Sequence, residues 1–137
     1  EAGERKTLMD VPRGLPALLR AEKIQARASR VGFDWPDVQG AWEKVKEEQA
    51  ELLEALESGQ AEKIEDEFGD LLFALVNVAR FLRVDPEEAL TKTIDKFIHR
   101  FQGMEEIATR RGLDLHQLNL EQLDNLWEEV KSKKNKW

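Results

Sequence analysis

The sequence predicts an all-α protein, a bundle of about five helices. Apolar residues recur every three or four positions along most of the 137 residues, and no stretch alternates with period two. Short breaks that contain Gly or Pro divide the chain into segments of helical length. Because these breaks are short, neighbouring helices are expected to pack mostly antiparallel.

The first helix is expected over residues 16–31, after an irregular lead-in or interdomain linker at residues 1–14. Pro16 suits the first position of a helix, where its missing N–H has no intrahelical partner anyway. The stretch GFDWP then breaks the helix, because Pro36 disfavours helical geometry at the residue before it. That residue, Trp35, is expected to be a hydrophobic plug in the loop rather than a ligand contact.

The second and third helices are expected over residues 37–57 and 60–82, joined by a tight turn at Ser58-Gly59. A helical wheel gives each of them an apolar face that should meet the core. The face of the second helix is marked by Val45, Leu52 and Leu56, widened by Trp42 and Leu53, and that of the third by Phe68, Leu72, Leu75 and Ala79.

A fourth helix is expected from Pro86 to about Arg111, because Asp85 before it is a good N-cap and acids follow in the first turn. Asn119, with a glutamine three residues later, marks the start of the last helix. That helix is expected to give way to a frayed basic tail at residues 132–137.

Composition excludes several classes of protein. The chain has no cysteine, so disulfides and thiolate metal sites are excluded, which fits a reducing compartment and a cytoplasmic location. With 28 acids against 21 bases, the net charge of -7 argues against binding to nucleic acid or to an anionic membrane. No apolar run reaches the roughly 20 residues of a membrane span. The start lacks a signal-peptide core and an initiator Met, so a piece of a longer chain is expected.

Two carboxylate pairs flank the apolar faces of the central helices. Glu48 and Glu51 are neighbours on the second helix, and Glu67 and Asp70 share a stripe of the third with Asn77. Antiparallel packing across the short turn would bring the pairs together, where four carboxylates repel one another unless a cation lies among them. All-oxygen ligation favours Mg²⁺, with Mn²⁺ as a substitute and Ca²⁺ less often. Asn77 should be partly buried and needs hydrogen-bond partners.

Other interpretations of these acids stay open. Glu-x-x-Glu is common on helices, and all four acids could simply be solvated. A di-iron site would need Glu-x-x-His pairs, and neither His99 nor His116 has an acid three residues earlier, so both are expected at the surface. Glu47 is a tempting general base, but its wheel position points away from the other acids.

The fourth helix carries Lys92, Lys96 and Arg100 on one face, four residues apart. Alone, this ladder could be a solvated stripe. Beside a magnesium site, it could hold a polyphosphate and stabilise charge in phosphoryl transfer. The sequence has neither a P-loop nor a dinucleotide-binding glycine motif, which leaves metal-activated water as the candidate nucleophile.

The acids follow the pattern Glu-x-x-Glu, 15 residues, Glu-x-x-Asp. This pattern resembles the signature of the MazG family, which are all-α nucleoside triphosphate pyrophosphohydrolases. The resemblance covers Val11 to Lys131, most closely like the C-terminal of two tandem domains, and implies one catalytic domain over residues 15–131. It is carried by the stretches GLPALLRAEKIQARASRVGFDW, KVKEEQAEL, EDEFGDLLFALVNVARFL, KFIHRF and LWEEVK.

The resemblance implies hydrolysis of nucleoside triphosphates, both NTPs and dNTPs, to the monophosphate and pyrophosphate. It implies Mg²⁺ on the four acids, phosphate contacts from Lys96, Arg100 and Lys44, and a nucleotide contact from Asn77. Trp127 corresponds to an aromatic residue near the base, although its place on a helix with apolar neighbours fits core packing equally well. The family also implies a homodimer or a dimer of dimers, with dimerisation completing the bundle.

Two rival functions stay open. A related enzyme could be specific for one nucleotide, such as a deoxypyrimidine triphosphate or phosphoribosyl-ATP. The chain could also be a non-catalytic helical dimerisation module whose acids are merely solvated.

Overall fold

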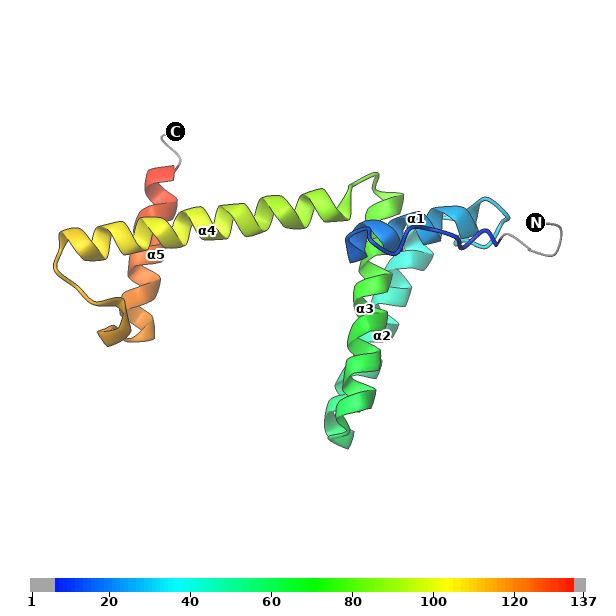
Figure 1. The fold of residues 1–137 in the computed structure, drawn as a ribbon. Helices are drawn as coiled ribbons and strands as arrows, with labels where there is room; N and C mark the ends of the chain where they lie inside the picture. Colours follow the sequence, from blue (N-terminus) through cyan, green and yellow to red (C-terminus); the bar gives the residue numbers. More distant parts are fainter. Residues whose placement is uncertain (1–6, 135–137) are drawn as a thin grey trace. The chain divides into compact units, whose positions relative to one another are not determined.

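The computed structural model describes residues 7–134, which form helices joined by short connections and contain no strand (Figure 1). The prediction of an all-α protein with about five helices is confirmed. The chain divides into two compact units, Glu1–Ala89 and Leu90–Trp137. The helices are α1 (Ala17–Ser29), α2 (Val38–Ser58), α3 (Ala61–Phe81), α4 (Pro86–Arg110) and α5 (Leu120–Lys134), with a 3₁₀ helix at Leu115–Gln117.

The helix ends follow the signals in the sequence. Asp37 caps α2 by accepting a hydrogen bond from the backbone N–H of Gln39. Gly59 ends α2 with a φ of 70°, a left-handed conformation that favours glycine. Before α5, Asn119 and Gln122 each accept a hydrogen bond from the other's backbone N–H, as a capping box requires. These local contacts explain why the predicted ends lie close to the observed ones.

Two helix ends differ from the prediction by two residues or more. α1 ends at Ser29, because the chain turns there and the N–H of Phe33 reaches back to the carbonyl of Ala28. α5 continues to Lys134, into the predicted tail, because lysine is a good helix former. The rest of that tail, like residues 1–6 of the predicted lead-in, lies outside the described residues.

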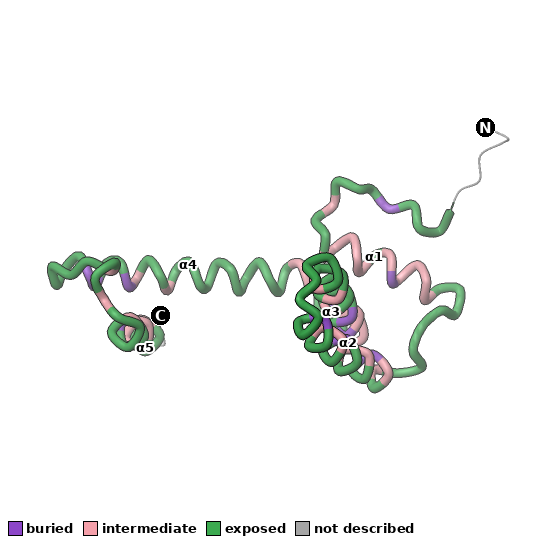
Figure 2. The backbone as a smooth tube through the Cα atoms, turned by 90° about the horizontal axis from the view of Figure 1, so that it is seen from below, coloured by how far each residue is buried: buried purple, intermediate pink, exposed green. Residues whose placement is uncertain are grey.

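α2 and α3 form an antiparallel hairpin, but they do not meet through the predicted apolar faces. Their buried residues are alanines, valines and one glutamate, namely Ala41, Glu48 and Ala55 on α2 and Ala74, Val76 and Val78 on α3 (Figure 2). Large residues of the predicted faces are instead exposed, including Leu56, Phe68, Leu72 and Leu75. The predicted core faces were therefore wrong, because a wheel groups residues by face without showing which face meets the neighbouring helix.

α1 packs against α3 and is tied to its backbone. The buried side chain of Gln25 donates a hydrogen bond to the carbonyl of Phe73, at 2.9 Å. Within the described chain, every helix is too short or too polar to serve as a membrane span.

The unit that contains α5 has its own small core. Met104 and Ile107 of α4 pack with Leu126 of α5, and Trp127 and Val130 lie against them. Gly103 permits a close approach there, since a Cβ atom at that position would lie 2.9 Å from a methyl group of Val130. The two helices are thus held together by a compact apolar cluster.

Candidate active site

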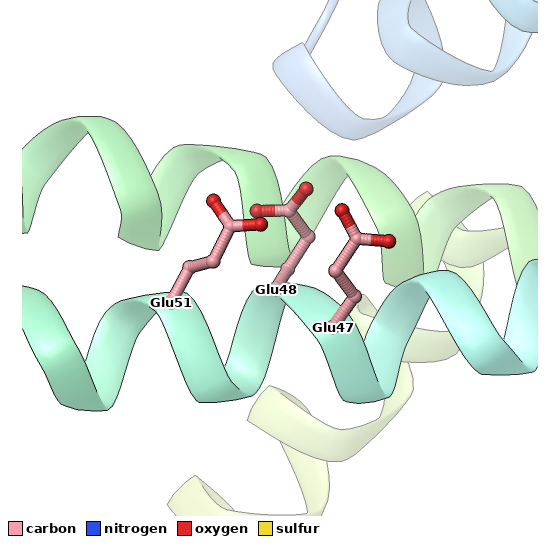
Figure 3. A group of neighbouring side chains, drawn as sticks. All are labelled: Glu47, Glu48 and Glu51. Atoms are coloured by element: carbon pink, nitrogen blue, oxygen red, sulfur yellow. The ribbon is translucent and has the colours of Figure 1, made fainter.

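Three glutamates of α2 extend from the helix on the side of α3 (Figure 3). One carboxylate oxygen each from Glu47, Glu48 and Glu51 lies within 4.8 Å of the other two. The prediction that Glu47 points away from the acids was wrong. A glutamate side chain is long and leans along the helix surface, so its carboxylate does not have to follow the wheel position of its Cα.

A second group of acids lies between α2 and α3. Oxygens of Glu48, Glu67 and Asp70 also lie within 4.8 Å of one another. Glu48 belongs to both groups and is only 5% exposed, whereas Glu67 is half-buried and Asp70 is exposed. The hairpin therefore brings all four predicted acids to one place, with Glu48 at the centre.

Two oxygens in these groups are buried without a hydrogen-bond partner. They are Oε1 of Glu48 and Oε1 of Glu67. A buried carboxylate oxygen normally accepts a hydrogen bond or binds a cation, because leaving it unpaired is costly. The donor set is made of oxygen atoms only, which suits a hard divalent cation. The residues present thus fit Mg²⁺.

Desolvation and the neighbouring negative charges raise the pKa of three of these acids. The negative charge of Glu48 raises the pKa of Glu51, with desolvation as a second cause. Desolvation raises the pKa of Glu67, and the charges of Glu51 and Asp70 add to it. Desolvation also raises the pKa of Asp70, followed by the charges of Asp66 and Glu48. Each shift means that the charged form is disfavoured without a cation nearby.

Lys44 partly neutralises the cluster. Its Nζ atom lies 2.9 Å from Oε2 of Glu48 and 3.1 Å from Oε2 of Glu47. These hydrogen bonds raise the pKa of the Lys44 ammonium well above its usual value, so it stays charged at neutral pH. Lys44, which was predicted to contact phosphate, is therefore paired with two acids of its own helix in this structure.

Asn77 is held by an arginine that sequence analysis did not single out. The Nε and Nη2 atoms of Arg80 donate to Oδ1 of Asn77, at 3.1 and 2.9 Å. Arg80 also pairs with Asp34 in the loop before α2, at 2.5 Å. The predicted need of Asn77 for hydrogen-bond partners is confirmed. The spacing of three residues between Asn77 and Arg80 was the one available signal, whereas nothing local pointed to Asp34.

Trp35 follows Asp34 in the same loop and lies against Gly40 at the start of α2. A Cβ atom at Gly40 would lie 2.8 Å from the indole ring. The ring is nevertheless 42% exposed, so it covers the helix start as a partial plug.

The remaining predicted site residues lie in the second unit. Lys96 is exposed, and Arg100 places its guanidinium 5.5 Å from the ring centre of Trp127. Trp127 also contacts Phe97, with 5.3 Å between ring centres, and packs against the apolar cluster. The core-packing interpretation of Trp127 is therefore correct within this unit. His99 and His116 are exposed, as predicted.

Known proteins match the chain over the segment that holds the acids. The MazG nucleotide pyrophosphohydrolase domain matches residues 38–104, which include α2, α3 and both carboxylate groups. The chain is 47% identical over 133 residues to the nucleoside triphosphate pyrophosphohydrolase/pyrophosphatase MazG of Thermotoga maritima. The chain belongs to the MazG family.

Two further relatives extend the comparison. The nucleoside triphosphate pyrophosphohydrolase of Escherichia coli K12 is 44% identical over 135 residues, and the protein YabN of Bacillus subtilis is 49% identical over 129 residues. These alignments cover 96% and 93% of the chain. The chain spans about half the length of the Thermotoga and Escherichia relatives, at 51% of each, and 26% of YabN.

Proposed function

We propose that this MazG-family chain hydrolyses nucleoside triphosphates to the monophosphate and pyrophosphate. The observation that carries the proposal is the pair of carboxylate groups joined at Glu48, with unpaired buried oxygens on Glu48 and Glu67. The names of the Thermotoga and Escherichia relatives point to the same activity.

We assign Glu48, Glu51, Glu67 and Asp70 as the magnesium ligands, with Mn²⁺ as a substitute. When bound, the metal would polarise the phosphate chain and make a bound water more acidic. The raised pKa values of Glu51, Glu67 and Asp70 support this assignment, because a cation among these acids would stabilise the charged forms that desolvation and the neighbouring charges disfavour.

Hydrolysis adds water across the bridge between the α and β phosphates. One P–O bond forms, one breaks, and the attacking water loses a proton. Glu47 is a candidate to accept that proton, because its exposed carboxylate lies within 4.8 Å of the Glu48 and Glu51 oxygens. Lys44 shares its charge between Glu47 and Glu48, so a cation bound at Glu48 would leave the ammonium available to a phosphate oxygen.

Further substrate contacts are assigned by family resemblance. Lys96 and Arg100 are proposed to neutralise charge on the phosphates, and Asn77 to contact the nucleotide. Arg100 has a buried Nε with no hydrogen-bond partner, which leaves it a donor for an anionic ligand. Trp127 is proposed to lie near the base, in addition to its place in the core of its unit.

A homodimer or a dimer of dimers is proposed as the active assembly. Large apolar side chains of the α2–α3 hairpin, including Leu53, Leu56, Phe68 and Leu72, are all at least 45% exposed. Such a surface is typical of a protein–protein contact, and a second copy of the chain is the partner that the family resemblance implies. Light scattering coupled to size exclusion would measure the mass in solution.

The product formed from ATP in the presence of Mg²⁺ tests the activity. AMP and pyrophosphate, resolved by ion-exchange chromatography, support the proposal, whereas ADP and phosphate, or no reaction, contradict it. A panel of triphosphates that includes deoxypyrimidine triphosphates and phosphoribosyl-ATP separates a general enzyme from a specific relative. The non-catalytic alternative predicts that Mg²⁺ with nucleotide leaves the thermal melting curve unchanged.

The variant Asp70→Asn tests the site. It keeps the size of the side chain and removes the charge of one ligand, so pyrophosphate release should be abolished while helicity by circular dichroism is unchanged. Full activity in this variant would show that the ligand assignment is wrong.

A further inference from the structure

Arg80 joins two segments that are far apart in the sequence. Its Nη2 atom pairs with Oδ1 of Asp34, 46 residues earlier, and the side chains of Arg80 and Asp34 are only 17% and 22% exposed. The same Asp34 oxygen accepts the backbone N–H of Trp35 at 2.9 Å. The carboxylate is therefore fixed by its own loop and holds the guanidinium in one orientation.

The guanidinium in turn determines which way the Asn77 amide faces. Both of its hydrogen bonds to Asn77 end on Oδ1. A guanidinium can only donate hydrogen bonds, so the amide must turn its oxygen toward Arg80 and its NH2 group away from it. If the amide were turned by half a rotation, its NH2 group would face the N–H groups of Arg80, and both hydrogen bonds would be lost.

Asn77 lies on the stripe of α3 that carries the acids. It follows Asp70 by seven residues, about 10.5 Å along the helix axis. At that separation it is too far from Asp70 to share a cation with it. If the phosphates of a substrate bind at the carboxylates, Asn77 can instead contact a more distant part of that substrate.

We infer that Arg80, held by Asp34, is a positioning residue that makes Asn77 a hydrogen-bond donor to the nucleotide. The inference rests on the proposed function, in which Asn77 contacts the substrate. It adds that the contacted group is an acceptor, such as a carbonyl, a hydroxyl or a ring nitrogen, and not an amino group.

Binding of an ATP analogue with a methylene group between the α and β phosphates tests this inference. Calorimetry with Mg²⁺ would compare the wild type with Arg80→Met, which keeps the aliphatic stem and removes the donors. We expect affinity to fall about tenfold in Arg80→Met and in Asn77→Ala, the loss of one well-oriented hydrogen bond. The double variant should bind no more weakly than Asn77→Ala, because Arg80 acts through Asn77.

Two further variants complete the test. Arg80→Lys should recover part of the affinity, since an ammonium is also only a donor. Arg83→Met, at an exposed arginine beyond the end of α3, is the matched control and should bind like the wild type. If Arg80→Met misfolds, Asp34→Asn weakens the same chain of contacts more gently, and its affinity should also fall.

The outcomes separate the two levels of the proposal. The positioning role alone is overturned if the losses of affinity multiply in the double variant. It is also overturned if Arg80→Met lowers the melting temperature and leaves the affinity unchanged. Unchanged affinity in Asn77→Ala overturns the assigned nucleotide contact and the positioning role with it. If the wild type itself does not bind the analogue, the proposed function fails.

Discussion

Replacing Glu48 by Gln removes the charge that both carboxylate groups share. In the metal-free protein, two effects of this change oppose each other. The variant loses the ion pair between Lys44, whose side chain is 38% exposed, and Glu48, whose side chain is 6% exposed, and a pair that solvent reaches from one side contributes about 1 kcal/mol, the upper end for exposed pairs. It also relieves the repulsion that raises the pKa of Glu51. The melting temperature without metal should therefore change by less than about 5 °C.

The effect of Mg²⁺ should differ much more. A ligand at a hundred times its Kd stabilises the folded state by about 2.7 kcal/mol. For a domain of this size, that free energy corresponds to a rise in Tm of about 10 °C. Glu48 belongs to both groups of acids, so Glu48→Gln should lose nearly all of this rise.

Thermal melts followed by far-UV circular dichroism, with and without Mg²⁺, measure both effects. Glu54→Gln is the matched control, because Glu54 is an exposed glutamate of the same helix outside both carboxylate groups. It should show the wild-type rise. The reasoning is refuted if Glu48→Gln keeps the full rise, if Glu54→Gln loses as much, or if Mg²⁺ leaves the wild type unchanged.

Three further predictions concern pH and packing. The raised pKa of Glu67 means that the folded protein binds the proton of this carboxyl more tightly than the unfolded chain does. Its destabilising contribution is therefore absent below about pH 4 and develops as pH rises through the raised pKa. Urea unfolding of metal-free Glu67→Gln should show a stability that improves relative to the wild type as pH rises, and the opposite trend would contradict the direction of the pKa shift. Trp127→Ala should destabilise the second unit by about 2–3 kcal/mol, because the ring packs on Phe97 and the apolar cluster; an unchanged Tm would show that the ring has no packing role. Gly103→Ala should be destabilising, since crowding against Val130 costs about 1–3 kcal/mol and exceeds the gain in helix propensity. The loss of stability should be smaller in a Val130→Ala background. An equal loss in both backgrounds would exclude the clash.

The candidate acids could be predicted because their arrangement is largely local. A spacing of three residues places Glu48 beside Glu51, and Glu67 beside Asp70, on any α-helix. The short turn at Gly59 then leaves the two helices little choice but to pack side by side. The hairpin and the closeness of the four acids were correctly predicted for this reason, whereas their role as metal ligands stays a prediction.

The partners of these acids could not be predicted in the same way. Whether Glu47 bends toward Glu48, and whether Lys44 reaches it, depends on side-chain rotamers that a wheel does not contain. The link between Asp34 and Arg80 depends on how a loop lies against α3. No spacing in the sequence indicates a contact between residues 46 positions apart.

The sequence by itself determined five helices, their caps, and a stripe of acids on each of two neighbouring helices. These features depend on backbone propensity and helical period, which act over a few residues. Only the tertiary structure decided that α2 and α3 meet along that stripe and not along their leucines. Small residues such as Ala55 and Ala74 allow the backbones to approach there, so Glu48 is buried between the helices while large apolar side chains remain exposed.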